Sequence, residues 1–169
     1  MPSPSIGQVL RGGQTNHQRD PLLMIVASLL FASVLTVYPV AYDLALWRPM
    51  FMLLVTVFWV IFQPKWCGIW FAFSVGLACD LLLDYPLGQH GFSFVLVAFL
   101  LRYLTRERRV LQPLLMWAFV LGASFLHLLV LFILQKMVSA ELSLGHWLTW
   151  LSTALCWPIV YSGLKRWRA

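Results

Sequence analysis

Charged residues are scarce in this sequence: Asp, Glu, Lys and Arg make up 11% of its 169 residues, against about 25% in ordinary globular domains. Hydrophobic residues make up 61%, and the mean hydropathy is +0.81. A helix needs about 20 apolar residues to cross a hydrocarbon core of about 30 Å. The composition therefore excludes an ordinary water-soluble domain and predicts an all-α fold, with one membrane domain made of several helical spans.

Cysteine and recognisable catalytic motifs are also rare or missing. The three cysteines, Cys67, Cys79 and Cys156, are odd in number and form no C-x-x-C motif, which argues against a disulfide framework or a zinc site. The sequence has no G-x-S-x-G nucleophile motif, no H-E-x-x-H motif and no Gly-rich phosphate loop. We therefore expect neither a metal nor a cofactor, and a non-catalytic protein rather than an enzyme.

Six apolar segments follow a polar tail of residues 1–20. The first segment lacks a small-residue cleavage site, so we expect it to be retained as a span. The first, fifth and sixth segments are long enough to cross a bilayer, and the third is marginal. The second and fourth are short and need tilt, local thinning or a re-entrant path. We expect a membrane domain at 21–164 and a basic tail at 165–169. The segments are 22–42, 49–62, 66–83, 87–101, 114–134 and 144–164.

Basic residues indicate which ends of the segments face the cytoplasm, because Lys and Arg in short loops favour that side. With six spans and a cytoplasmic amino terminus, ten of the twelve basic residues fall on the cytoplasmic side, leaving Arg48 and Lys136 outside. Both termini are then cytoplasmic. If the two short segments were re-entrant, only Lys65 would change sides. The net charge of +6 lies at span ends, where it meets anionic lipid headgroups, and does not indicate nucleic-acid binding.

The third segment carries two carboxylates, Asp80 and Asp84, near its predicted outer end. Gly68, Ala72 and Gly76 precede them at intervals of four, a spacing that keeps neighbours on one face of a helix. The small residues would let another helix approach closely. An ionisable group inside a membrane segment is costly and needs a partner. The need is greater here because the carboxyl end of a helix disfavours negative charge.

Two features on the same predicted side can compensate these carboxylates. One is Arg48, just before the second segment. The other is the turn 86–90, Pro-Leu-Gly-Gln-His, whose backbone N–H groups open the fourth helix and favour an anion. We expect one carboxylate to pair with Arg48 and the other to cap the turn, which would lock segments two, three and four together. The residues of this structural and partner-binding lock are Arg48, Asp80, Asp84, Gly88 and His90.

The same residues allow two other interpretations. The carboxylates could form a paired-carboxylate active site or an ion site, although catalysis would need a further base, nucleophile or ligand set nearby. His90 could also join Asp80 and Asp84 as a metal ligand, although one histidine with two acids is a weak metal signal.

Several other residues indicate helix packing. His127, in the middle of the fifth segment, is expected to form a hydrogen bond with a neighbouring helix. A proline inside a helix removes a backbone donor, so Pro158 is expected to kink the sixth segment. The residues expected at helix contacts are Gly68, Ala72, Gly76, Gly122 and Pro158.

The sequence resembles the MreD family of rod shape-determining membrane proteins in several motifs. They are Arg48-Pro49 at the start of the second segment, the block 76–84 (Gly-Leu-Ala-Cys-Asp-Leu-Leu-Leu-Asp) and the block 86–91 (Pro-Leu-Gly-Gln-His-Gly). Trp59, Pro64, Gly68 and the pair Trp157-Pro158 before a basic end also fit. The resemblance covers most of the chain from Arg48 onward and does not include the polar tail.

The resemblance implies a small polytopic subunit of the bacterial elongation machinery in the cytoplasmic membrane. Members of the family bind the bitopic scaffold MreC. With it they link MreB filaments inside the cell to peptidoglycan synthesis outside by the glycosyltransferase RodA and its penicillin-binding transpeptidase partner. The six-helix layout is similar to that of the substrate-binding subunits of energy-coupling-factor transporters.

Three hypotheses for function remain. The first is a non-catalytic partner subunit that docks another protein's transmembrane helix by close packing. The second is a solute-binding transport subunit, in which the loop 84–90 covers a polar pocket. The third is an intramembrane enzyme that acts on a lipid-linked substrate through Asp80, Asp84 and His90. We favour the first, because the sequence contains no complete catalytic set.

Overall fold

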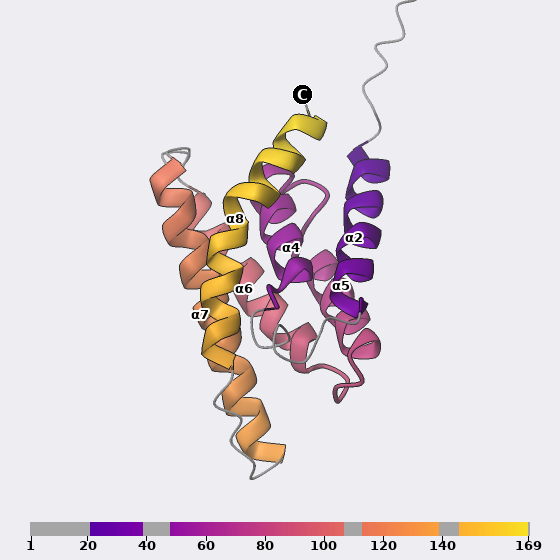
Figure 1. The fold of residues 1–169 in the computed structure, drawn as a ribbon, viewed down its shortest axis with the longest axis vertical. Helices are drawn as coiled ribbons and strands as arrows, with labels where there is room; N and C mark the ends of the chain where they lie inside the picture. Colours follow the sequence, from indigo (N-terminus) through magenta and orange to yellow (C-terminus); the bar gives the residue numbers. More distant parts are fainter. Residues whose placement is uncertain (1–20, 39–47, 107–112, 139–145, 169) are drawn as a thin grey trace, which may run out of the picture.

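The chain folds into a bundle of α-helices in the computed structural model (Figure 1). The structure describes residues 21–38, 48–106, 113–138 and 146–168, so the predicted tail 1–20 lies outside the described residues. The described part contains six helices and no strand, which confirms the all-α prediction for it. The helices are α2 (Pro21–Val37), α4 (Phe51–Phe62), α5 (Ile69–Leu82), α6 (Gln89–Thr105), α7 (Pro113–Val138) and α8 (His146–Arg168).

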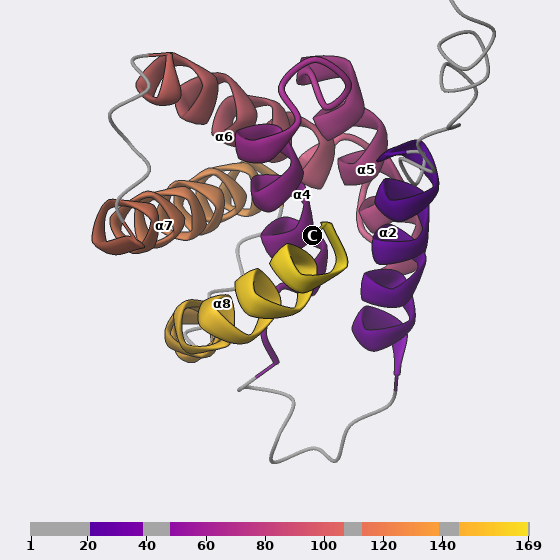
Figure 2. The same ribbon diagram turned by 90° about the horizontal axis from the view of Figure 1, so that it is seen from above.

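Helix α4 lies at the centre of the bundle, and the other five helices contact it from around its sides (Figure 2). Its twelve residues are apolar except for Thr56, and residues 52–60 are all buried. Helices that are hydrophobic on every side are typical of buried positions. The Thr56 hydroxyl donates a hydrogen bond to the Met52 carbonyl (2.7 Å), and the Trp59 indole N–H donates to Ser28 Oγ of α2 (2.8 Å). The short second segment is therefore a core helix.

One described helix, α7, is long and apolar enough to cross a membrane without help, through its residues Leu114–Met137. Three others, Leu22–Val37, Phe51–Phe62 and Ile69–Leu82, are apolar but shorter. The described residues of the first and sixth segments do not meet the same measure of length and apolar character. Helix α2 has 17 residues. Helix α8 has 23, but Ser, Thr and a basic end reduce its hydropathy. Its helix continues to Arg168, so most of the expected tail 165–169 forms its last turn.

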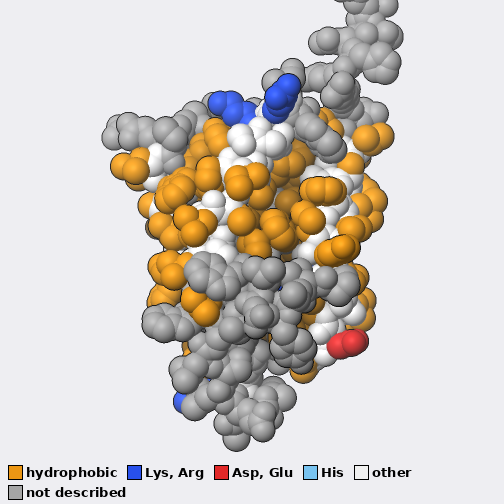
Figure 3. All heavy atoms as spheres, in the orientation of Figure 1, with side chains coloured by type: hydrophobic (Ala, Val, Ile, Leu, Met, Phe, Trp, Pro, Cys, Tyr) orange, Lys and Arg blue, Asp and Glu red, His pale blue; other side chains and the backbone are white. Residues whose placement is uncertain are grey.

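The surface of the bundle carries many large hydrophobic side chains. Trp70, Leu114 and Met137 are each more than 80% exposed, whereas soluble proteins rarely expose large continuous apolar patches. Figure 3 shows a broad hydrophobic band on one face, with Lys and Arg side chains gathered at the end where α8 ends. The start of α2 lies at that same end of the bundle (Figure 1). A surface of this kind suits lipid better than water.

Cys67 provides a test of the fold at the loop between α4 and α5. The residue is fully buried, and its N–H donates to the Gln63 carbonyl (2.9 Å). Buried structural cysteines are inert to thiol reagents, whereas reactive cysteines are partly exposed. We expect a maleimide to leave Cys67 unmodified in the folded protein at pH 8 and to modify it in SDS. Peptide mass spectrometry would measure both. Equal labelling rates in the two states would contradict this packing.

Candidate functional site

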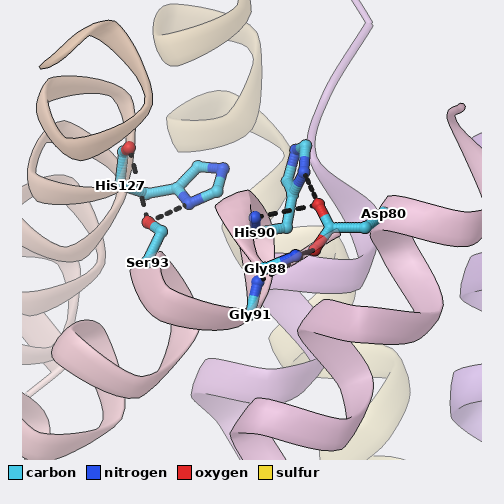
Figure 4. Close-up of polar contacts among 6 residues, drawn as sticks. All are labelled: Asp80, Gly88, His90, Gly91, Ser93 and His127. Atoms are coloured by element: carbon cyan, nitrogen blue, oxygen red, sulfur yellow. Dashed lines mark hydrogen bonds and ion pairs between the residues drawn. The ribbon is translucent and has the colours of Figure 1, made fainter. Parts of the chain in front are cut away.

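Asp80 lies near the end of α5, and its side chain is completely buried. Its Oδ2 accepts hydrogen bonds from the N–H groups of Gly88 (2.8 Å) and Gly91 (3.4 Å). Its Oδ1 accepts from the His90 N–H (2.9 Å) and lies 2.7 Å from His90 Nδ1. Figure 4 shows the carboxylate of α5 pointing into the first turn of α6. Four donors therefore converge on one carboxylate, which uses its acceptor sites fully.

These bonds complete the amino end of α6, where the first N–H groups of a helix lack partners within the helix. The N-cap residue is Gly88, which has φ +101° and no side chain that could cap the helix. The Gln89 N–H donates to the Pro86 carbonyl (3.3 Å), and the next two N–H groups donate to Asp80. Asp80 thus replaces the usual N-cap side chain, and its negative charge is favoured at the positive end of the helix dipole.

Gly76 brings the backbones of α5 and α6 into direct contact one turn before Asp80. A Cβ atom at Gly76 would lie 2.5 Å from Gly91 Cα and 2.7 Å from both Gly91 N and the His90 carbonyl oxygen. No real Cβ fits at those distances, so the glycine is required for the close approach. Ala72, Gly76 and Asp80 are all buried, which keeps three members of the predicted four-residue spacing at the helix contact.

Asp84 does not take part in the carboxylate site. Helix α5 ends at Leu82, and Asp84 has φ 54°, the left-handed conformation that follows many helix ends. The Tyr85 N–H donates to the Asp80 carbonyl (3.1 Å), the bond of a Schellman motif. The chain therefore reverses before Asp84, whose side chain is exposed. The expected role of Asp84 in the lock is not supported, because the four-residue spacing holds only while the helix continues.

Arg48 binds the end of α2 and not a carboxylate, which corrects the predicted pairing with Asp80 or Asp84. Its Nη2 donates to the carbonyls of Tyr38 (2.8 Å) and Leu35 (3.4 Å). Those carbonyls lack partners within the helix and lie at its negative end, so a guanidinium is favoured there. Within the described residues, the Asp80 carboxylate contacts no Lys or Arg side chain, and its one side-chain partner is His90.

His90 and His127 lie side by side between α6 and α7, with ring centroids 5.5 Å apart (Figure 4). His90 Nδ1 faces the Asp80 carboxylate, which can only accept, so Nδ1 carries a proton, and in the neutral ring Nε2 then keeps a lone pair. His127 Nδ1 shares a hydrogen bond with Ser93 Oγ of α6 (2.6 Å). This contact confirms the predicted interhelical bond of His127.

The other residues expected at helix contacts have different environments. Gly68 is the N-cap residue of α5, and a Cβ there would lie 3.2 Å from Arg102 Nη1. Gly122 is exposed and would have no heavy atom within 4 Å of an added Cβ, so its predicted close contact is wrong for the described residues. Helix α8 continues on both sides of Pro158, although the proline cannot donate to the Ala154 carbonyl.

Neither a paired-carboxylate site nor a three-ligand metal site forms in the described part of the chain. Asp84 is exposed whereas Asp80 is buried, and no three His, Cys, Asp or Glu side chains come together there as metal ligands. Sequence reasoning missed Gly91 and Ser93 as members of the site. Their positions one and three residues after His90, on the first turns of the helix that the anion caps, are the signal that could have found them.

The sequence matches the protein family described as rod shape-determining protein MreD over residues 18–166. It is 25% identical over 150 residues to the Rod shape-determining protein MreD of Haemophilus influenzae. The alignment covers 84% of this chain and 88% of that protein. No solved structure matches the chain, so the predicted likeness to energy-coupling-factor subunits has no support. The family match extends over all six described helices. The chain therefore belongs to the MreD family of rod shape-determining membrane proteins.

Proposed function

We propose that this protein is a non-catalytic subunit of the rod-shape complex, which binds the scaffold MreC and helps couple MreB filaments to peptidoglycan synthesis by RodA and its transpeptidase partner. The observation that carries the non-catalytic part is the use of Asp80. All four of its contacts go to the turn and first residues of α6, so the carboxylate has no acceptor site left for a substrate. Its bonds stabilise a shape.

The site supports partner binding because it fixes how α5 and α6 lie against each other. The α5–α6 pair combines the Gly76 backbone contact with the buried carboxylate. Lipid tails are as apolar as the side chains of a membrane helix, so the hydrophobic effect does not drive helices together in the membrane. Recognition there depends on close packing of defined surfaces. Exposed aromatic side chains such as Trp70 and Phe99 on these two helices offer surfaces that a partner's transmembrane helix could cover.

We propose further that the bundle is a multi-pass protein of the cytoplasmic membrane, with both termini in the cytoplasm. Four basic residues lie in a loop or near a helix end on the predicted cytoplasmic side: Lys65, Arg102, Lys165 and Arg166. Lys and Arg near span ends favour that side. Arg48 and the α5–α6 turn would then face the outer side.

Co-purification with MreC tests the proposed partner. We expect tagged MreC from the same organism to recover this protein from mild-detergent extracts in near-equal amounts, whereas an unrelated polytopic membrane protein is not recovered. Protection of Cys67 from maleimide would show that the protein in the extract is folded. Failure to recover folded protein with MreC would overturn this proposal.

A further inference from the structure

A cavity of about 250 Å³ lies beside the α5–α6 turn, between α2, α4, α5, α6, α7 and α8. We call it the Arg48 cavity. One side is apolar, with Met52, Leu53, Phe94 and Leu131. The polar side chains that line it are Thr36, Arg48, Tyr85, His90, His127 and Thr149. Cavities with apolar walls and a few converging polar groups are typical of small-molecule sites.

Arg48 gives this cavity a positive charge that the described residues do not neutralise. Its Nη2 is occupied by the carbonyls at the end of α2, but its Nε is buried and has no hydrogen-bond partner among the described residues. The carboxylate of Asp80 does not line the cavity and is fully occupied by α6. Leaving a buried donor of a charged group without a hydrogen bond is costly. An anionic acceptor in the cavity would therefore stabilise the guanidinium.

The two histidines supply further hydrogen-bonding groups to the lining of the cavity. Asp80 holds His90 through Nδ1, and Ser93 holds His127 through Nδ1. Each ring therefore has one nitrogen bound to the protein, and both rings line the cavity. The His90 Nε2 lone pair can accept a hydrogen bond from a hydroxyl group next to the anion. Held rings of this kind lose little freedom when a ligand binds.

An apolar groove of about 370 Å³ lies between α2, α4 and α8. Leu35 and Phe51 line the groove, and their chain neighbours Thr36, Met50 and Met52 line the Arg48 cavity. The two hollows thus share the helices α2, α4 and α8, and one hollow is cationic whereas the other is apolar. This pairing matches a molecule with an anionic head and a hydrocarbon chain, and the cavity alone is too small for an acyl chain.

We propose that the Arg48 cavity binds the phosphate of a phospholipid headgroup, with an acyl chain in the apolar groove. Phospholipid headgroups present phosphate esters at the membrane surface, and basic pockets between transmembrane helices bind such headgroups. Arg48 would bind the phosphate through Nε, and His90 would accept from a headgroup hydroxyl. Lipid binding here does not depend on MreC, whereas it shares His90 with the α5–α6 lock.

Native mass spectrometry of the delipidated full-length protein tests the proposal, with phosphatidylglycerol, diacylglycerol of the same chains and inorganic phosphate as probes. Arg48→Gln removes the charge but keeps an N–H donor for the α2 carbonyls. Arg106→Gln is the matched control, because Arg106 is exposed at the other end of α6. We expect one phosphatidylglycerol per chain, binding weakened about tenfold or more by Arg48→Gln, and no effect of Arg106→Gln. Diacylglycerol and inorganic phosphate should not bind.

Leu131→Trp provides a second variant, because it fills the cavity from α7 and leaves Arg48 in place. It should also weaken phosphatidylglycerol binding while Cys67 stays protected from maleimide. Equal binding by wild type, Arg48→Gln and Leu131→Trp would overturn the site. Arg48-dependent binding of inorganic phosphate alone would overturn the lipid and indicate a soluble phosphate compound.

Discussion

Asn in place of Asp80 is expected to destabilise the folded protein by about 2–4 kcal/mol. One of the two carboxylate oxygens would become an NH₂ group that faces backbone N–H donors of α6 instead of accepting from them. The negative charge at the amino end of α6 would also be lost. Unfolding in mixed micelles with rising SDS, followed by maleimide labelling of Cys67, measures the change.

Asp84→Asn is the matched control for this substitution. The same chemical change is made four residues later on an exposed side chain, at φ 54°, a conformation that Asn tolerates well. We expect its unfolding midpoint to equal that of the wild type or to lie slightly higher. Equal destabilisation by the two variants would show that the bonds to α6 are not what makes Asp80 important.

Alanine in place of Gly76 is expected to destabilise the protein by more than about 2 kcal/mol. The added Cβ would meet the backbone of Gly91 and His90 at 2.5–2.7 Å, and backbone cannot move aside as a side chain can. The helices α5 and α6 would have to separate, which would also lengthen the Asp80 bonds. The same SDS titration measures the loss.

Gly122→Ala is the control for the glycine substitution. Gly122 lies inside α7 and has open space around an added Cβ. Replacing a helical glycine by alanine there should be neutral or should stabilise by up to about 1 kcal/mol. If Gly76→Ala were as stable as Gly122→Ala, the close contact of α5 with α6 would be wrong.

The contact of a carboxylate with the turn 86–90 could be predicted from the sequence, because the amino end of a helix attracts an anion wherever the chain brings one near. Which carboxylate makes it depends on where α5 ends, and helix ends are poorly defined by hydropathy alone. Leu82 ends the helix, so Asp80 stays on the contact face and Asp84 enters the turn.

The partner of Arg48 could not be predicted, because backbone carbonyls carry no signal in the sequence. The end of α2 offers carbonyls that compete with a carboxylate for the guanidinium. The role of the short second segment was equally hidden. Its length suggested tilt or a re-entrant path, whereas its position at the centre of the bundle explains why it is apolar on every side.

We propose that Asp80 acts by holding α5 against α6 and not by chemistry. Cell shape can be scored at graded expression of wild type and Asp80→Asn in a rod-shaped host that lacks its own copy, and plotted against the amount of folded, Cys67-protected protein in the membrane. We predict that both proteins fall on one curve, so that enough folded Asp80→Asn restores rods. Round cells at a folded amount that gives rods with the wild type would contradict the claim.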